Sequence, residues 1–186
     1  MSSTPATTTS ATSTWNLDPA HSSAEFKVKH MMISNVKGKF HQISGVLTLD
    51  DADPSRSNVE ASIPIASLNT GDAQRDGHLK SADFLDAEKF PTMTFKSSEV
   101  RKISASEYAV VGALSIHGET RNVSFAVEDV SAPGKDPWGN IRIGLTATAR
   151  INRKDFGLTW NSPLETGGVL VGDDVQITLD VQFIKA

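Results

Sequence analysis

The chain has 186 residues, a formal net charge of −4, 38% hydrophobic and 22% charged residues, and no cysteine. This size and composition fit one globular domain, which buries about 70% of the surface of the unfolded chain. The missing cysteines exclude disulfides, thiolate metal sites and a cysteine nucleophile. Because no block of basic residues occurs, we expect no nucleic-acid partner.

Residues 1–14 consist almost entirely of Ser, Thr, Ala and Pro. They have neither the basic start nor the apolar core of about 7–15 residues that defines a secretory signal. No apolar run of about 18 residues occurs anywhere in the chain, so we expect no membrane span. We therefore predict a disordered tail over residues 1–14, a single domain over residues 15–186 and a cytoplasmic location.

Alternation of apolar and polar residues begins near Trp15. Within residues 22–30, Phe26, Val28 and His30 share one face with Ala24, and lysines take the other face, which is typical of a half-buried strand. The apolar residues change phase between positions 36–40 and 43–49. This change predicts a bend or bulge near residues 41–44, and another strand follows at residues 59–65.

The second half of the chain alternates in the same way. Strands are predicted over residues 92–98, 108–116, 121–127, 141–151 and 175–183, with a loop at 133–139 and an irregular segment at 152–173. About eight strands with one apolar face each predict an all-β fold, either a sandwich or a closed antiparallel barrel. Their length and the single helical insertion favour the barrel. A barrel of eight strands is either filled by side chains or holds one small ligand.

The insertion is the segment 71–90, here called the connector. Asp72 is a good helix cap, Gly77 within the helix keeps it short, and Ser81 is expected to cap a second helical turn. Pro91 ends this turn before the next strand. We interpret the connector as a lid or plug on the barrel.

The sequence does not favour catalysis. The five histidines form no HxH, HxxxH or HExxH spacing, so we expect no metal site. Ser115 and His117 lack the GxSxG turn of a hydrolase, and neither a GxGxxG motif nor a P-loop occurs. We therefore predict no catalytic residues, no cofactor and no enzymatic activity.

Several motifs resemble those of the YceI-type, lipocalin-like proteins. The opening matches at Asp18-Pro-Ala-His-Ser, Phe26-Lys-Val-Lys-His and Val36-Lys-Gly-Lys-Phe. The middle matches at Arg75-Asp-Gly-His-Leu, Asp83-Phe-Leu and Phe90-Pro, and the later part at Leu114-Ser-Ile-His-Gly and Asp155-Phe-Gly. The resemblance covers residues 15–186. It implies an extended eight-stranded antiparallel barrel with helical cover, whose apolar channel binds polyisoprenoids or similar amphiphiles. Many relatives carry a secretory signal, which is not seen here.

On this basis we predict a set of ligand-binding residues: Phe26, Val28, His30, Phe40, Arg75, His78, Phe84, Phe90, Phe95 and Trp160. The aromatic members are also compatible with an ordinary core. His30 fits a hydrogen-bonded core histidine better than a ligand contact. Arg75 and His78 either clamp the connector or meet a phosphate or other polar head group at a channel mouth.

The resulting hypothesis is a non-enzymatic carrier or sequestering protein. Its ligand would be a long-chain apolar amphiphile of the polyisoprenoid, isoprenoid quinone or fatty type. An enzyme acting on a small apolar substrate in the barrel is the alternative, and a ligand-free interaction module is a third hypothesis if the barrel is packed solid. The sequence leaves a homodimer open.

Overall fold

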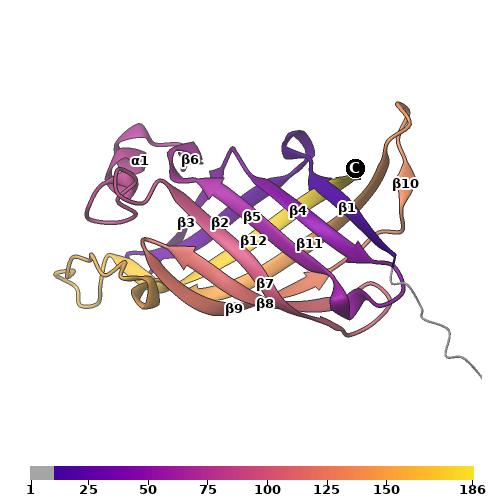
Figure 1. Cartoon of the computed structure of the whole chain (residues 1–186). Helices are drawn as coiled ribbons and strands as arrows, with labels where there is room; N and C mark the ends of the chain where they lie inside the picture. Colours follow the sequence, from indigo (N-terminus) through magenta and orange to yellow (C-terminus); the bar gives the residue numbers. More distant parts are fainter. Residues whose placement is uncertain (1–10) are drawn as a thin grey trace, which may run out of the picture.

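The computed structural model describes residues 11–186, and strands make up most of this part of the chain (Figure 1). The strands are β1 (Thr12–Leu17), β2 (Ser23–His30), β3 (Ser34–Phe40), β4 (Ser44–Asp50), β5 (Asn58–Pro64), β6 (Leu68–Asn69), β7 (Thr92–Lys102), β8 (Tyr108–Ile116), β9 (Glu119–Glu128), β10 (Gly134–Lys135), β11 (Ile141–Asn152) and β12 (Val171–Lys185). The helices are α1 (Ala73–Lys80) and the 3-10 turns η1 (Pro19–His21), η2 (Pro54–Arg56), η3 (Ile65–Ser67) and η4 (Arg153–Phe156).

The predicted eight-stranded antiparallel barrel is confirmed. Neighbouring strands follow the order β11-β9-β8-β7-β5-β4-β1-β12, and pairing of β12 with β11 closes the ring. This closing ladder runs from Arg142–Ile184 to Asn152–Asp174. The strands β2, β3 and β6 extend the sheet from the first part of β12.

A sharp bend separates β1 from β2, although both pair with β12. The end of β12 pairs with β1, and residues 171–180 pair with β2. Asp18 and Pro19 make the bend, because the Asp18 carboxylate accepts the Ala20 N–H at 3.0 Å and proline occupies the first position of η1. Because of this bend, β1 and β2 pair with different parts of β12 although they follow each other in the chain.

An ion-paired clamp holds this bend to β11, which lies on the other side of β12. Arg142 Nη1 lies 2.6 Å from Asp18 Oδ2, and Arg142 Nε lies 2.7 Å from Asp136 Oδ2. The hydrogen bond from Arg142, helped by His21, lowers the pKa of Asp18 to about 2. Arg142 also holds the pKa of Asp136 well below its ordinary value. Both carboxylates therefore stay charged at a lower pH than an ordinary aspartate does.

Two sequence predictions need correction. Residues 1–10 of the predicted tail lie outside the described residues. Thr12, Ser13 and Thr14 belong to β1 and pair with residues 48–50 of β4, so the predicted disorder is wrong for these three residues. The prediction of a second helical turn in the connector is also wrong. Ser81 begins a run of hydrogen-bonded turns, in which its carbonyl accepts the N–H groups of Phe84 and Asp86. The bend at residues 41–44 and the Asp72 cap of α1 are confirmed.

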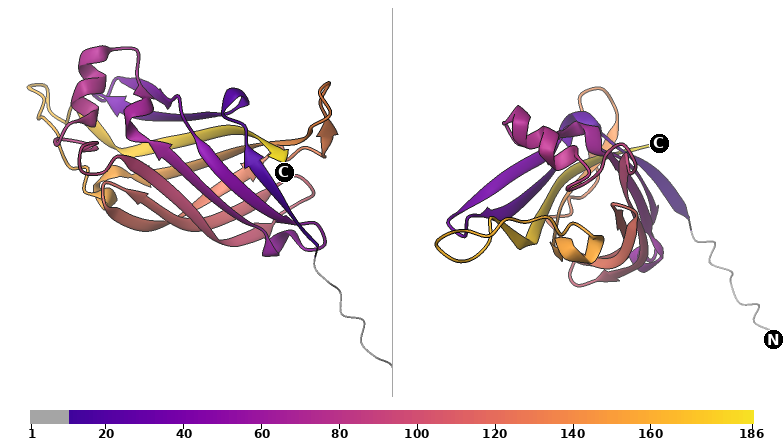
Figure 2. Two further views of the ribbon diagram at one scale, coloured as in Figure 1. Left: turned by 45° about the horizontal axis from the view of Figure 1, so that its top comes forward. Right: turned by 90° about the vertical axis from the view of Figure 1, so that its left-hand side faces the viewer.

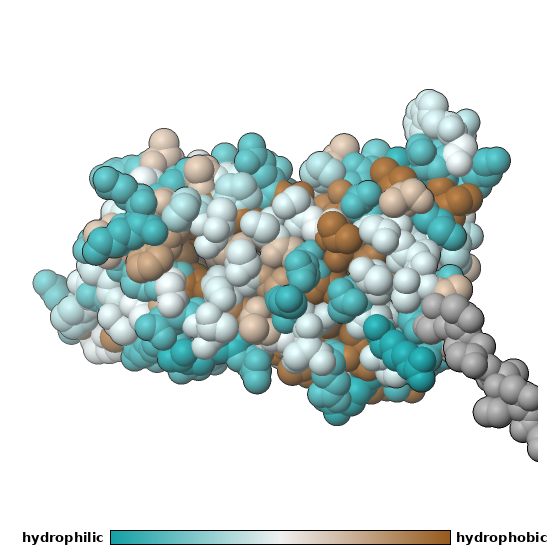
Figure 3. Space-filling model, in the orientation of Figure 1, coloured by the Kyte–Doolittle hydropathy of each residue, from teal (hydrophilic) through white to brown (hydrophobic). Residues whose placement is uncertain are grey.

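The core lies inside the barrel as two clusters of buried apolar side chains. One cluster centres on Trp15 and Ile65, and the other centres on Phe156. On the face shown in Figure 3 the surface is mostly hydrophilic or neutral, with hydrophobic residues visible between the polar ones. Within residues 11–186, no helix combines the length and the apolar character that a membrane crossing requires.

Candidate functional site

The barrel is hollow. It encloses a cavity of about 520 Å³, which lies within the range of ligand-binding sites in proteins, about 300–1,000 Å³. The inward residues of the strands line the cavity, because alternate side chains of a strand face opposite sides. Small inward residues leave part of the space open: Ala24, Ala61 and Ala147. The aromatic residues of the lining are Phe26, Phe40, Phe84, Phe95, Tyr108, Phe125 and Phe183.

The two ends of the cavity differ in chemistry. At the end where β4 stops and β5 begins, Asp50 and Ser57 line it beside Asn58. Asp50 is only 1% exposed, and its Oδ1 accepts the N–H groups of Ala52 and Asp53 at 3.0 Å each. The carboxylate therefore orders the turn that follows β4. At the opposite end the connector contributes apolar residues to the lining.

The connector covers that end of the barrel (Figure 2). Leu79, Phe84 and Leu85 reach the cavity from it. The Phe84 ring is buried and lies 5.1 Å from the His78 ring and 5.2 Å from the Trp160 ring, measured between ring centres. His78 and Trp160 meet edge to face at 4.7 Å. These two rings fix Phe84 from behind and do not line the cavity themselves.

Arg75 supports the start of the connector and does not line the cavity. Its Nε and Nη2 groups donate to the hydroxyl and the carbonyl oxygen of Thr70, both at 2.8 Å. Asp76 accepts the Thr70 N–H at 2.9 Å and the Thr70 hydroxyl. Burial alone would raise the pKa of Asp76, but these two hydrogen bonds hold it below its ordinary value. These contacts agree with the interpretation that Arg75 holds the connector in place, and the interpretation that it meets a polar head group stays a prediction.

Arg153 lines the cavity, and the sequence did not point to it. The side chain is 3% exposed, and burial lowers its pKa while the charge of Asp173 raises it. Its Nε donates to the Gly172 carbonyl at 2.8 Å, and Nη1 donates to the carbonyls of Leu158 and Trp160 at 2.6 and 2.9 Å. Nη2 lies 3.7 Å from Asp173 Oδ1. The guanidinium thus pins residues 158–172 to the barrel, and its donors are engaged by the protein.

The ten predicted site residues divide into two groups. Those that line the cavity are Phe26, Val28, Phe40, Phe84 and Phe95, and those outside the lining are His30, Arg75, His78, Phe90 and Trp160. His30 is half-buried at the end of β2, opposite Ser34, and Phe90 packs against His117 with ring centres 5.0 Å apart. That the first group binds a ligand stays a prediction.

Tyr108 also belongs to the lining and was not predicted to do so. It occupies an inward position of β8, so the alternation that predicted this strand was the available signal. In the part of the chain described, no group of three or more His, Asp or Glu side chains is placed to hold a metal ion.

Comparison with known proteins gives consistent matches. The sequence model of the YceI-like domain matches residues 15–183. A UPF0312 protein of Staphylococcus aureus is 39% identical over 170 residues, which cover 91% of this chain and 96% of that protein. The crystal structure of BcnA from Burkholderia cenocepacia has a TM-score of 0.78 at 25% identity, covering 89% of this chain and 98% of BcnA. A polyisoprenoid binding domain from Saccharophagus degradans has a TM-score of 0.65 at 15% identity, covering 92% and 98%.

Proposed function

Because this chain belongs to the YceI-like family, we propose that it binds a long-chain apolar amphiphile of the polyisoprenoid or isoprenoid quinone type inside the barrel. The cavity of about 520 Å³, lined mainly by aliphatic and aromatic side chains, is the observation that carries the proposal. A solid core would have favoured a ligand-free interaction module. The name of the similar domain from Saccharophagus degradans adds support, although the 15% identity makes this a likeness of fold.

Desolvation would drive the binding. Each methylene group that leaves water for the cavity contributes roughly 0.8 kcal/mol, so one five-carbon isoprene unit contributes roughly 4 kcal/mol. Ordering a long flexible chain offsets part of this gain. Apolar burial also discriminates weakly between ligands, because one methylene group is worth only about 1–3 kcal/mol of specificity. We therefore propose selection by length and cross-section of the chain.

We propose binding without turnover, since the two buried charged groups of the lining, Asp50 and Arg153, are already engaged in structural hydrogen bonds. Asp50 accepts two backbone N–H groups of its own turn, and Arg153 donates to backbone carbonyls of the segment that it anchors. A general acid or base has to lie within hydrogen-bond reach of the substrate atom with which it exchanges a proton. These groups support the cavity wall, and the protein acts as a carrier or sequestering protein.

Lipid extraction from the purified full chain tests this proposal. Mass spectrometry of the extract should show a long-chain isoprenoid in a fixed ratio to protein. Delipidated protein should then bind a prenyl quinone with saturation at one ligand per chain. A barrel that co-purifies with no lipid and binds neither prenyl quinone nor prenyl alcohol would contradict the proposal.

A further inference from the structure

The turn between β2 and β3 exposes three large apolar side chains in succession. Met31 is 42% exposed, Met32 61% and Ile33 78%. Val169, 38% exposed, lies on the adjoining loop, which the Met31 N–H reaches through a 2.7 Å hydrogen bond to the Leu170 carbonyl. The turn and this loop project side by side (Figure 2). We call Met31, Met32, Ile33 and Val169 the apolar tip; it holds four of the seven exposed large hydrophobic residues in the described part of the chain.

The backbone conformation of this turn is unfavourable for the residues that occupy it. Met31 has φ of 53° and Met32 has φ of 60°, so two consecutive non-glycine residues adopt the left-handed conformation. Asn and Gly are the residues that such hairpin turns favour. Methionine at these positions strains the turn, yet its flexible thioether side chain adapts well to irregular apolar surroundings.

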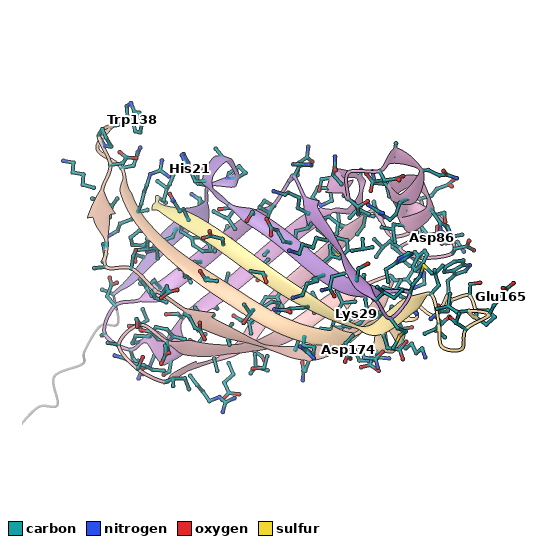
Figure 4. All side chains as sticks on the ribbon, turned by 180° about the vertical axis from the view of Figure 1, so that it is seen from behind. His21, Lys29, Asp86, Trp138, Glu165 and Asp174 are labelled. Atoms are coloured by element: carbon teal, nitrogen blue, oxygen red, sulfur yellow. The ribbon has the colours of Figure 1, made fainter. Side chains whose placement is uncertain are left out.

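A row of lysines continues from the tip along the outward face of the hairpin. Lys27 and Lys29 of β2 and Lys37 and Lys39 of β3 share this face, and Lys27 stands directly opposite Lys37. Like charges at directly opposite positions of a sheet are unfavourable for folding. The acidic residue on these two strands is Glu25, 3.5 Å from Lys39. Figure 4 shows Lys29 on the outer surface of the barrel.

The tip adjoins one end of the cavity. Val28, on the inward face of β2, lines the cavity two residues before His30, the last residue of the strand. Val171, which pairs with His30, also lines it. The same hairpin therefore presents a cavity wall on its inner face, lysines on its outer face and apolar side chains at its end.

From this arrangement we propose that the apolar tip docks the protein on the surface of an anionic lipid bilayer. Exposed apolar side chains enter the boundary between head groups and acyl chains, and adjacent lysines are attracted to anionic head groups. An anionic bilayer matches both features, because it offers an apolar interior under a negatively charged surface. The inference goes beyond cargo binding and does not depend on it: docking concerns the outside of the barrel.

Flotation of the delipidated full chain with vesicles tests the proposal. One set of vesicles contains phosphatidylcholine alone, and the other contains phosphatidylcholine with phosphatidylglycerol. The chain should float with the vesicles that contain phosphatidylglycerol. The amount of protein that floats should be at least tenfold lower with phosphatidylcholine alone, and at least tenfold lower at high salt. The double variant Met31→Asn/Met32→Gly should lose at least tenfold of the binding. Its thermal midpoint should stay equal or rise, because these residues suit the turn.

One control variant and one further test variant address other apolar and charged groups. Trp138, 80% exposed, lies at the end of the molecule opposite Glu165, which shares the loop of Val169 (Figure 4), so Trp138→Ala should float like the parent chain. The double variant Lys27→Gln/Lys37→Gln should lose the preference for phosphatidylglycerol.

Full binding by the Met31→Asn/Met32→Gly variant, or no binding by the parent chain to either vesicle, would overturn the proposal. Self-association that this variant abolishes, without vesicle binding, would assign the tip to a second copy of the chain. Because no cargo is added, failure here leaves the lipid-extraction result as it stands.

Discussion

Three glycines in the strands offer a graded test of how much room the structure leaves for an added methyl group. A Cβ added at Gly144 would lie 3.8 Å from the nearest atom, the Val181 carbonyl oxygen, which is an ordinary contact. At Gly38 it would lie 2.4 Å from Cζ of the Phe26 ring, the movable end of a side chain. At Gly112 it would lie 2.3 Å from the Lys96 carbonyl oxygen, which belongs to the backbone of the adjoining strand.

The expected change in the free energy of unfolding depends on which atoms the added methyl group displaces. Gly144→Ala should be neutral or stabilise by up to about 1 kcal/mol, because alanine restricts the unfolded chain more than glycine does. Gly38→Ala should cost roughly 1–2 kcal/mol, since overpacking is relieved when the Phe26 ring swings into the cavity. Gly112→Ala should cost roughly 3 kcal/mol or more, because the ladder between β7 and β8 has to shift.

Ligand affinity separates the variants in a second way. A Phe26 ring displaced into the cavity takes the space of two or three methylene groups of the cargo, which lowers affinity by roughly 2 kcal/mol, or about thirtyfold. Urea unfolding gives the stabilities, and titration of delipidated protein with a prenyl quinone gives the affinities. Gly38→Ala protein that binds as well as Gly144→Ala protein would refute the reasoning that Phe26 and the cargo share one space.

The remaining predictions concern the connector, the buried arginine, acid stability and the first strand. Phe84→Asp should abolish cargo binding while circular dichroism still shows the barrel, because a charged carboxylate would face the apolar cavity at a desolvation cost of several kcal/mol. Arg153→Met should lower the stability to urea by roughly 3 kcal/mol or more, since several buried carbonyls lose their donor. The pKa of the Asp18 carboxyl is lowered to about 2 in the folded protein. Its contribution to folding stability is therefore complete above the ordinary pKa near 4 and is lost as the pH falls toward 2. Urea unfolding at pH 6, 4 and 2.5 should show a smaller loss of stability for Arg142→Met than for the parent chain. A chain that begins at Trp15 should melt at a lower temperature than the full chain, because it lacks the β1 residues that pair with β4.

Sequence reasoning succeeded where a repeating pattern reflects the structure. Alternation predicted the long strands, and the motif resemblance predicted the barrel and its helical cover. It failed for β1, because Thr12, Ser13 and Thr14 resemble the low-complexity residues before them, and their strand conformation depends on pairing with β4. No local pattern encodes a partner that lies more than thirty residues away.

The site was predictable in its apolar part and less so in its polar part. Inward phenylalanines such as Phe26 and Phe95 follow from strand alternation. Arg75 and His78 were assigned to a channel mouth or a clamp, and the structure gives them partners within the connector or at its start, Thr70 and Asp83. Arg153 was missed because its role depends on carbonyl groups that converge only after the 158–172 segment folds back on the barrel.

The strand that closes the barrel also sets the order of events during synthesis. β12 is the last strand of the fold, and it pairs with β1, where Trp15 meets Lys185. A ribosome must therefore release nearly the whole chain before the ring can form, and such distant pairing is slow to establish. Until that moment the inward face of every earlier strand is open to water and to other nascent chains. A lipid that binds the half-built sheet would shorten this exposed period.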